Sequence, residues 1–211
     1  DAEQIFVVGD LFDFWFEYKH VVPKGYVRIL GKLAELTDAG IDIRFFVGNH
    51  DMWMKNYFQQ ELNIPVYFEP AYFTLRGKKF LIGHGDGLGP GDKGYKMLKK
   101  IFRNPVCQWL FGIIPPSIGI GLANYFSKKS RQAAGNHQLE KFMGEENEWL
   151  IQYCKEVLKT EQLDYFIFGH RHLPLDIQLN ENSRYINLGE WINYNSYAVI
   201  EDDKVLLKYY N

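Results

Sequence analysis

The stretch Gly48-Asn49-His50-Asp51 decides the fold of this chain. It follows the apolar run 43–47 and precedes a segment that starts at Met52. Because strands buried on both faces of a sheet read as continuous apolar runs, we interpret 43–47 as such a strand. Three other stretches repeat the order of apolar run, glycine and metal-capable side chain: Phe6-Val7-Val8-Gly9-Asp10, Phe80-Leu81-Ile82-Gly83-His84 and Phe166-Ile167-Phe168-Gly169-His170. Since α/β folds place their sites beyond strand ends, the four ends predict one shared site.

Length and composition place the chain among globular proteins. It has 211 residues, of which 46% are hydrophobic and 17% aromatic, so we expect a single domain over residues 1–211 with a sizeable core. The net charge of −2 gives no case for nucleic acid as a partner. The charge is unevenly placed, however, because residues 93–131 contain eight Lys or Arg and no Asp or Glu.

The apolar pattern predicts an α/β protein. A strand over 4–8, a helix over 26–39 and a strand over 43–47 form a βαβ unit, whose strands we expect to be parallel. Helices are also predicted after Asp51 to about residue 61 and over 140–159. Further strands are predicted at 66–68, 72–75, 79–82, 165–168, 176–179, 184–187, 197–200 and 205–209, with a hairpin turn at Arg76-Gly77.

Residues 93–131 are unlike the rest of the chain. A basic helix over 93–102 precedes the uncharged, apolar stretch 105–126. Its length resembles that of a membrane span, but Pro115-Pro116 divides it into pieces too short to cross a bilayer. We therefore predict a helical hairpin with an apolar face and basic flanks. Core packing and a lipid-facing cap both remain open as its role.

The two cysteines give no metal-binding or redox motif. Cys107 and Cys154 lack CxxC spacing, so reduced core thiols are expected, with a disulfide as the alternative. Asp1-Ala2-Glu3 leads straight into the first apolar strand. We therefore expect the sequence to begin within the fold, so the lack of a leader peptide says little about location.

Five side chains near the strand ends are candidate metal ligands. Imidazole, carboxylate and amide oxygen together suit Mn, Fe, Zn, Co or Ni, and two such ions would polarise a phosphoryl group and generate hydroxide from water. Any one of the histidines alone would more often be a core or surface residue, but the repeated glycine lead-in favours ligands. The candidates are Asp10, Asn49, His84, His170 and His172.

His50 is better placed for acid chemistry than for metal binding. It is adjacent to Asn49 and cannot easily bind the same ion. An imidazole at this position can serve as a general acid or as a hydrogen-bond donor to a transition state, with a carboxylate that fixes its tautomer.

The order Gly9-Asp10-x-x-Asp13, Gly48-Asn49-His50-Asp51, Gly83-His84 and Gly169-His170-x-His172 resembles the calcineurin-like metallophosphoesterases. The resemblance implies a four-layer αββα sandwich that binds two divalent metal ions, with Mn expected before Fe or Zn. It implies that Asp10 bridges the ions, that Asn49, His84 and His170 complete one metal site, and that His172 belongs to the other. It also implies that His50 is the catalytic histidine and Asp13 its orienting partner.

One motif of that family is missing. The family opens with Asp-x-His on the first strand, and those residues supply the second metal site. The sequence begins at Asp1 without them, so we expect a fragment that lacks its first strand. On this sequence the second site keeps only Asp10 and His172.

A narrower resemblance covers residues 84–131. His84-Gly85-Asp86, Gln108-Trp109-Leu110-Phe111 and Ser127-Lys128-Lys129-Ser130 are similar to the UDP-2,3-diacylglucosamine hydrolase family. That family cleaves the pyrophosphate of a diacylated sugar nucleotide to UMP and the 1-phosphate lipid used for lipid A. The resemblance implies that 93–131 is an inserted cap for the acyl chains and that the enzyme is cytoplasmic and peripheral on the inner membrane. The implied substrate contacts are Asn49, Asp92, Tyr95, Ser130 and Arg131.

His50 departs from this narrower pattern, because the well-known branch of the hydrolase family has Arg there. Another calcineurin-like phosphoesterase, acting on a different lipid or nucleotide phosphodiester, is therefore the alternative. A non-catalytic scaffold with the same fold is a third hypothesis. The retained Asp10, Asn49 and His84 disfavour the scaffold.

Overall fold

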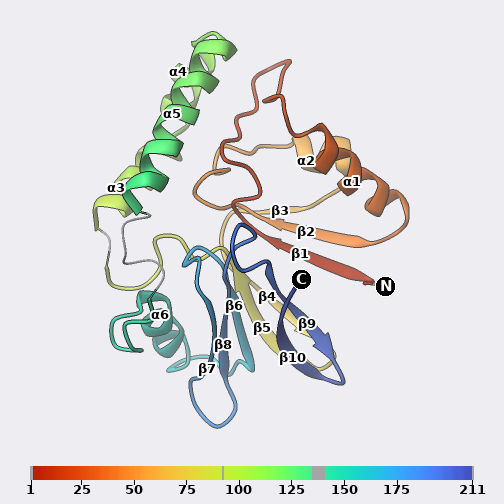
Figure 1. Cartoon of the computed structure of the whole chain (residues 1–211), viewed down its shortest axis with the longest axis vertical. Coiled ribbons are helices and arrows are strands. Elements are labelled where there is room, and N and C mark those ends of the chain that lie inside the picture. Colours follow the sequence, from red (N-terminus) through yellow and green to blue (C-terminus); the bar gives the residue numbers. More distant parts are fainter. Residues whose placement is uncertain (1, 92, 135–140, 211) are drawn as a thin grey trace. The chain divides into compact units, whose positions relative to one another are not determined.

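The computed structural model describes residues 2–91, 93–134 and 141–210, and only the backbone of residues 130–134. The chain divides into two compact units (Figure 1). Unit 1 comprises Asp1–Glu69 and Lys93–Ala133, and unit 2 comprises Pro70–Asp92 and Ala134–Asn211. The single domain expected over residues 1–211 and the cap expected over residues 93–131 stay predictions.

Unit 1 contains a parallel sheet of three strands in the order β1-β2-β3. Strand β1 (Gln4–Val8) pairs with β2 (Asp42–Phe46) along its whole length, so the carboxyl ends of the two strands coincide. Helix α1 (Val27–Asp38) connects them and packs against β2. Strand β3 (Val66–Tyr67) completes the sheet. The predicted βαβ unit is confirmed.

Helix α2 (Tyr57–Leu62) begins later than the sequence predicted, and residues 52–56 are not helical. The buried carboxylate of Glu17 accepts hydrogen bonds from the backbone N–H groups of Lys55 (2.8 Å), Asn56 (2.9 Å) and Tyr57 (3.1 Å). The bonds from Asn56 and Tyr57 satisfy amides that the start of a helix leaves without partners. A distant side chain therefore determines where α2 begins.

Three helices follow one another in residues 93–134: α3 (Lys93–Phe102), α4 (Pro105–Ile113) and α5 (Pro116–Ala134). Figure 1 draws them in yellow and green. The side chain of Asn104 caps α4 by accepting from the backbone N–H groups of Val106 and Cys107. The predicted break at Pro115-Pro116 is confirmed. Among the described residues, none of the helices is long and apolar enough to cross a membrane.

Aromatic side chains form most of the core of unit 1. Phe12, Trp15 and Phe16 are buried, so the aromatic loop before α1 packs inward. Phe111 of α4 joins them, with its ring centroid 4.8 Å from Phe16 and 4.6 Å from Trp53. These contacts hold α4 on the core of unit 1.

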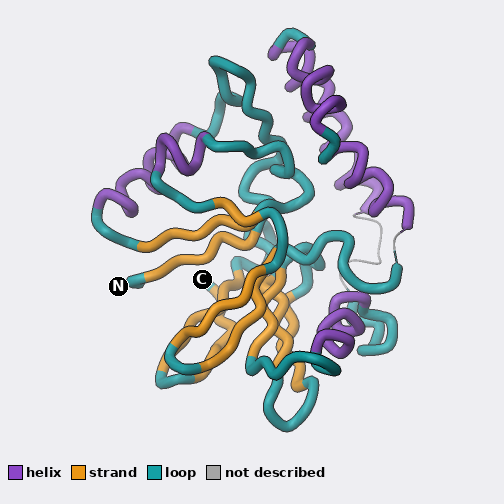
Figure 2. The backbone as a smooth tube through the Cα atoms, turned by 180° about the vertical axis from the view of Figure 1, so that it is seen from behind, coloured by secondary structure: helices purple, strands orange, loops and turns teal. Residues whose placement is uncertain are grey.

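Unit 2 contains a five-stranded sheet in the order β4-β5-β6-β8-β7 (Figure 2, orange). Strands β5, β6 and β8 are parallel, while β4 and β7 run antiparallel to their neighbours. The predicted hairpin turn is confirmed, because Arg76 and Gly77 both have positive φ, at 48° and 75°. The strands of unit 2 are β4 (Ala71–Leu75), β5 (Lys78–Gly83), β6 (Tyr165–Phe168), β7 (Pro174–Gln178), β8 (Arg184–Leu188) and the separate antiparallel pair β9 (Ser196–Glu201) and β10 (Lys204–Tyr209).

The helix predicted over 140–159 is shorter than expected, because α6 spans Trp149–Val157. Gly144 has φ of 89°, and Asn147 N–H donates to its carbonyl at 3.0 Å. This left-handed turn ends any helical path through residues 141–148. Helix α6 packs into the core of unit 2 through residues that include Cys154, and both cysteines are free thiols, as predicted.

Candidate active site

The ends of β1 and β2 approach each other closely in unit 1. The backbone N–H of His50 donates to Asp10 Oδ1 at 2.8 Å. A Cβ atom on Gly48 would lie 2.2 Å from the same oxygen and 2.6 Å from the Asp10 backbone nitrogen. Only glycine allows this approach, so the glycine of the motif brings Asp10 beside Asn49 and His50.

Asp51 holds the two loops together from inside. Its carboxylate is fully buried and accepts from the Gly48 N–H at 2.6 Å and from the Leu11 N–H at 3.0 Å. A carboxylate with backbone donors on both sides links the loop after β1 to the loop after β2. The sequence reasoning gave Asp51 no role.

The imidazole of His50 lies against two oxygen atoms. Nδ1 is 3.2 Å from the backbone carbonyl oxygen of Asp13 and 3.0 Å from Oγ of Ser127 on α5. The expected pairing of Asp13 with His50 is present, and it runs through the carbonyl, where the sequence reasoning favoured a carboxylate. The Ser127 contact was missed, because it joins residues 77 positions apart.

Two of the three predicted histidine ligands lie side by side in unit 2. His84 follows β5 and His170 follows β6, and these strands are parallel neighbours. The Gly169 N–H donates to the His84 carbonyl at 3.0 Å, which keeps the two strand ends together. The ring centroids of His84 and His170 are 5.2 Å apart, with an interplanar angle of 70°.

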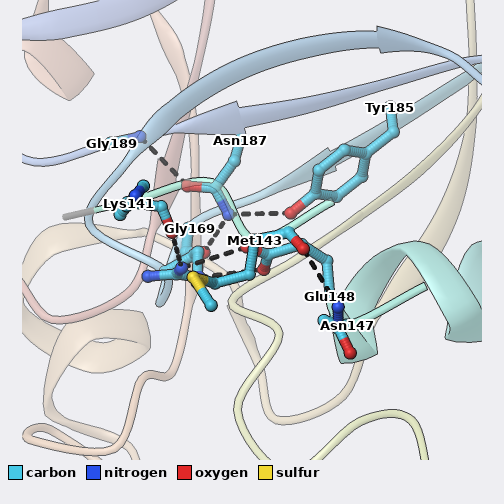
Figure 3. A network of polar contacts seen from close by, with 9 residues as sticks. Lys141, Met143, Asn147, Glu148, Gly169, Tyr185, Asn187 and Gly189 are labelled. Atoms are coloured by element: carbon cyan, nitrogen blue, oxygen red, sulfur yellow. Dashed lines mark hydrogen bonds and ion pairs between the residues drawn. The ribbon is translucent and has the colours of Figure 1, made fainter. Parts of the chain in front are cut away.

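His170 and His172 have strained backbones. Their φ angles are 61° and 53°, in the left-handed region that side chains rarely adopt. Such a residue costs about 1–3 kcal/mol, so neighbouring groups must hold it in place. The side-chain amide of Asn187 on β8 donates to the Gly169 carbonyl and to Tyr185 Oη (Figure 3). Burial raises the pKa of Tyr185 above its usual value, which keeps this hydroxyl neutral.

Arg171, between the two histidines, is held by an ion pair. Its Nε and Nη2 donate to Glu148 Oε2 at 2.9 Å and Oε1 at 3.0 Å, in bidentate geometry. Nη2 also donates to the Lys141 carbonyl at 2.8 Å. The Glu148 side chain is only 5% exposed, and Glu148 precedes α6. The sequence reasoning missed this pair, whose members are 23 residues apart.

The expected substrate contacts are less completely described. Asn49 is half-buried beside Asp10, and Tyr95 is half-buried on α3. Asp92 lies outside the described residues. Ser130 and Arg131 lie on the last turns of α5, and their side chains are outside the described part of the chain.

The predicted ligand types suit a divalent cation. Asp10 and Asn49 belong to unit 1, and the three histidines to unit 2. Within either unit, the described residues include no group of three or more His, Cys, Asp or Glu side chains placed to hold a metal ion. Asp10 has φ of 54°, so it shares with His170 and His172 the strained backbone that often marks functional positions.

Comparison with known proteins places these observations in a family context. The family model described as calcineurin-like phosphoesterase matches residues 1–174. A Porphyromonas gingivalis protein named UDP-2,3-diacylglucosamine hydrolase is 40% identical, covering 99% of this chain and 84% of that protein. A protein of the same name from Photorhabdus laumondii is 28% identical over 97% of this chain and 84% of its own length. Among solved structures, Vacuolar Protein Sorting 29 from Cryptosporidium parvum aligns with a TM-score of 0.39 at 13% identity, covering 97% of this chain and 94% of that one.

Proposed function

The chain belongs to the calcineurin-like phosphoesterase family, and we propose that it hydrolyses the pyrophosphate of UDP-2,3-diacylglucosamine to UMP and 2,3-diacylglucosamine 1-phosphate in lipid A biosynthesis. Family membership confirms the predicted fold class. The observation that carries the function is the 40% identity to a UDP-2,3-diacylglucosamine hydrolase over 99% of the chain. Relatives that are 26–28% identical bear the same name.

Calcineurin-like phosphoesterases use divalent metals. We assign Asp10, Asn49, His84, His170 and His172 as ligands of two ions, with Mn favoured over Fe or Zn. Carboxylate, amide and imidazole donors support this choice. When bound, such ions polarise the phosphoryl group and lower the pKa of water. Of these residues, Asp10 and Asn49 belong to unit 1, and the three histidines belong to unit 2.

His50 acts on the substrate through Nε2. Nδ1 faces the Asp13 carbonyl and Ser127 Oγ, so Nε2 is the ring atom available to a phosphate oxygen. The imidazolium form, which has a proton on each ring nitrogen, would donate a hydrogen bond from Nε2 to the oxygen that becomes negatively charged as the P–O bond breaks. Asn49, Asp92, Tyr95, Ser130 and Arg131 are retained as proposed substrate contacts.

Helices α3–α5 are proposed to bind the acyl chains and to meet the inner membrane from the cytoplasmic side. Large apolar side chains on all three helices are exposed, while the Lys side chains nearby suit anionic headgroups. Core packing explains only the face of α4 and α5 that contacts the core of unit 1, which includes Phe111, Ile120 and Ala123. The exposed apolar residues are Met97, Leu98, Ile101, Val106, Trp109, Leu110, Ile113, Ile118, Leu122, Tyr125 and Phe126.

A different phosphodiester remains the second candidate substrate. The observation that favours it is His50, at a position where the well-known branch of the hydrolase family has Arg. Such an enzyme would use the same metal ligands on another lipid or nucleotide.

The test measures UMP release from UDP-2,3-diacylglucosamine by the full-length enzyme with Mn²⁺. We expect turnover, and we expect a variant with Ile113, Ile118 and Leu122 changed to Ser to lose at least about tenfold in kcat/KM on this substrate and little on a soluble, deacylated analogue. Ile192→Ser, which removes an exposed apolar residue of unit 2, is the matched control. Turnover of a simple phosphodiester without UMP release would exclude the first substrate, and equal losses on both substrates would exclude the acyl-binding role.

A further inference from the structure

We infer that Ser127 of α5 is a positioning residue, which holds His50 in the tautomer that has its proton on Nδ1. This inference rests on the proposed function of His50 at Nε2. It assigns to α5 a second role besides its exposed apolar face, because the same helix would orient the catalytic imidazole.

One face of α5 is packed against unit 1, and Ser127 continues it. Ile120 and Ala123 lie on this face and contact the core of unit 1. Residues three and four apart share a helix face, so Ser127 follows them at the next turn, where it is half-buried. On the preceding turn, a Cβ atom on Gly119 would lie 2.5 Å from Tyr18 Oη, so glycine permits the close approach of α5.

Three groups meet where this face reaches the loop after β1. Ser127 Oγ is 2.9 Å from the Asp13 carbonyl oxygen, to which it donates. His50 Nδ1 is 3.0 Å from Ser127 Oγ and 3.2 Å from the same carbonyl oxygen. All three distances are within hydrogen-bond range, so the atoms form a closed triangle.

The triangle permits one arrangement of protons. A carbonyl oxygen only accepts, and a serine hydroxyl has a single proton to donate. Since Ser127 gives that proton to Asp13, the contact between Ser127 and His50 requires N–H on Nδ1. The contact between Nδ1 and Asp13 requires the same proton. In the neutral ring Nε2 then carries the lone pair.

This arrangement matters because the ring has two neutral tautomers in water. Without Ser127, Nδ1 keeps only the longer contact to Asp13, and the ring is less restrained both in tautomer and in rotation. The orientation of Nε2 then depends on how α5 is docked. An interaction of this kind changes kcat more than KM, since it acts on the reacting group and not on substrate affinity.

The direct test is nitrogen NMR of the histidine rings in the full chain loaded with diamagnetic Mg²⁺. His50 signals are assigned by their loss in His50→Gln. We expect a protonated Nδ1 and an unprotonated Nε2 in the wild-type protein, a mixture of tautomers in Ser127→Ala, and the wild-type pattern in Ser127→Thr, which keeps the hydroxyl. Ser117→Ala, on an exposed position of the same helix, is the control. A wild-type proton on Nε2, or an unchanged pattern in Ser127→Ala, would overturn the inference.

Kinetics provide the second readout. Ser127→Ala should lower kcat about tenfold with KM within about twofold, as for other residues that orient a reacting side chain, and Ser127→Thr should recover most of the loss. An equal loss in the Ala and Thr variants would contradict the hydroxyl's role. If the enzyme releases no UMP while the NMR pattern is as expected, the proposed substrate fails and the positioning role stands.

Discussion

The two units hold their candidate ligands by different means. In unit 1, backbone amides bind the carboxylates of Asp10 and Asp51 around a glycine that admits no side chain. In unit 2, the side chains of Glu148 and Asn187, which come from other elements, hold the loop that contains Arg171. The first arrangement joins the loops after β1 and β2 and depends on one buried acid, Asp51. The second arrangement uses several side chains to hold one loop. The loss of any one of them should therefore reduce stability and activity less than the loss of Asp51 does.

Asp51→Ala tests the first arrangement and should have the largest effect. It removes the acceptor of two backbone N–H groups, Gly48 and Leu11. A buried donor left unsatisfied costs about 1–3 kcal/mol, so we expect the free energy of unfolding to fall by about 3 kcal/mol. The loops that orient Asn49 would also move, and displacement of positioned groups can cost about 100-fold in rate. Urea denaturation and turnover measure the two effects.

The control for this prediction is Asp38→Ala, which removes an exposed acid of α1. Exposed substitutions of this kind usually change stability by less than about 0.5 kcal/mol. If the Asp51→Ala enzyme is stable and active, the close contact between Gly48 and Asp10 is enough to hold the two loops together.

Glu148→Ala tests the second arrangement and should have an intermediate effect. It leaves Arg171, whose side chain is 14% exposed, without its carboxylate partner. Breaking a buried pair costs about 3–5 kcal/mol, and the partial exposure of Arg171 reduces this to about 2 kcal/mol. Loss of the support for His170 and His172 should lower metal affinity about tenfold, measured by metal titration.

A neighbouring pair gives the matched control. Glu145 and Lys155 are 2.7 Å apart and largely exposed, so Glu145→Ala should cost less than about 0.5 kcal/mol. A double change of Glu148 and Arg171 to Met should recover stability without metal affinity, since it removes the isolated charge but not the need to position the loop. If Glu145→Ala and Glu148→Ala have equal effects, the ion pair of Arg171 with Glu148 does not help to hold the histidines in place.

The sequence predicted the features that are encoded locally. Four of the five predicted ligands directly follow an apolar strand and a glycine, and the fifth, His172, lies two residues after His170. The strands, the parallel pairing of β1 with β2 and the break at Pro115-Pro116 follow from patterns of the same short range. The acid that closes the loop after β2, Asp51, was equally local but was overlooked because its neighbours are candidate ligands.

Contacts between distant residues could not be predicted. Ser127 meets His50 only because α5 docks on unit 1, and Arg171 meets Glu148 only because α6 begins at Trp149. The sequence suggested an earlier start for α6, because Phe142 and Met143 fit a helical stripe that the left-handed Gly144 interrupts. Tertiary packing outweighs local propensity at such places.

The smallest expected effect is an alkaline loss of stability that originates in unit 2. Burial raises the pKa of the Cys154 thiol above its ordinary value of 9.0. As pH rises past about 9, the unfolded chain therefore loses this proton before the folded chain does, and the stabilisation present below that pH declines. Between pH 9 and 10 we expect the free energy of unfolding to fall by about 1 kcal/mol through this group, since one pKa unit corresponds to about 1.4 kcal/mol. The Cys154→Ala protein should be less stable than the wild type at pH 7, but its free energy of unfolding should fall less between pH 9 and 10. Urea denaturation at each pH measures both values.

Alkylation provides the control: half-buried Cys107 should react in the folded protein, and fully buried Cys154 only after unfolding. Identical pH dependence in both proteins would mean that the thiol is not the group responsible.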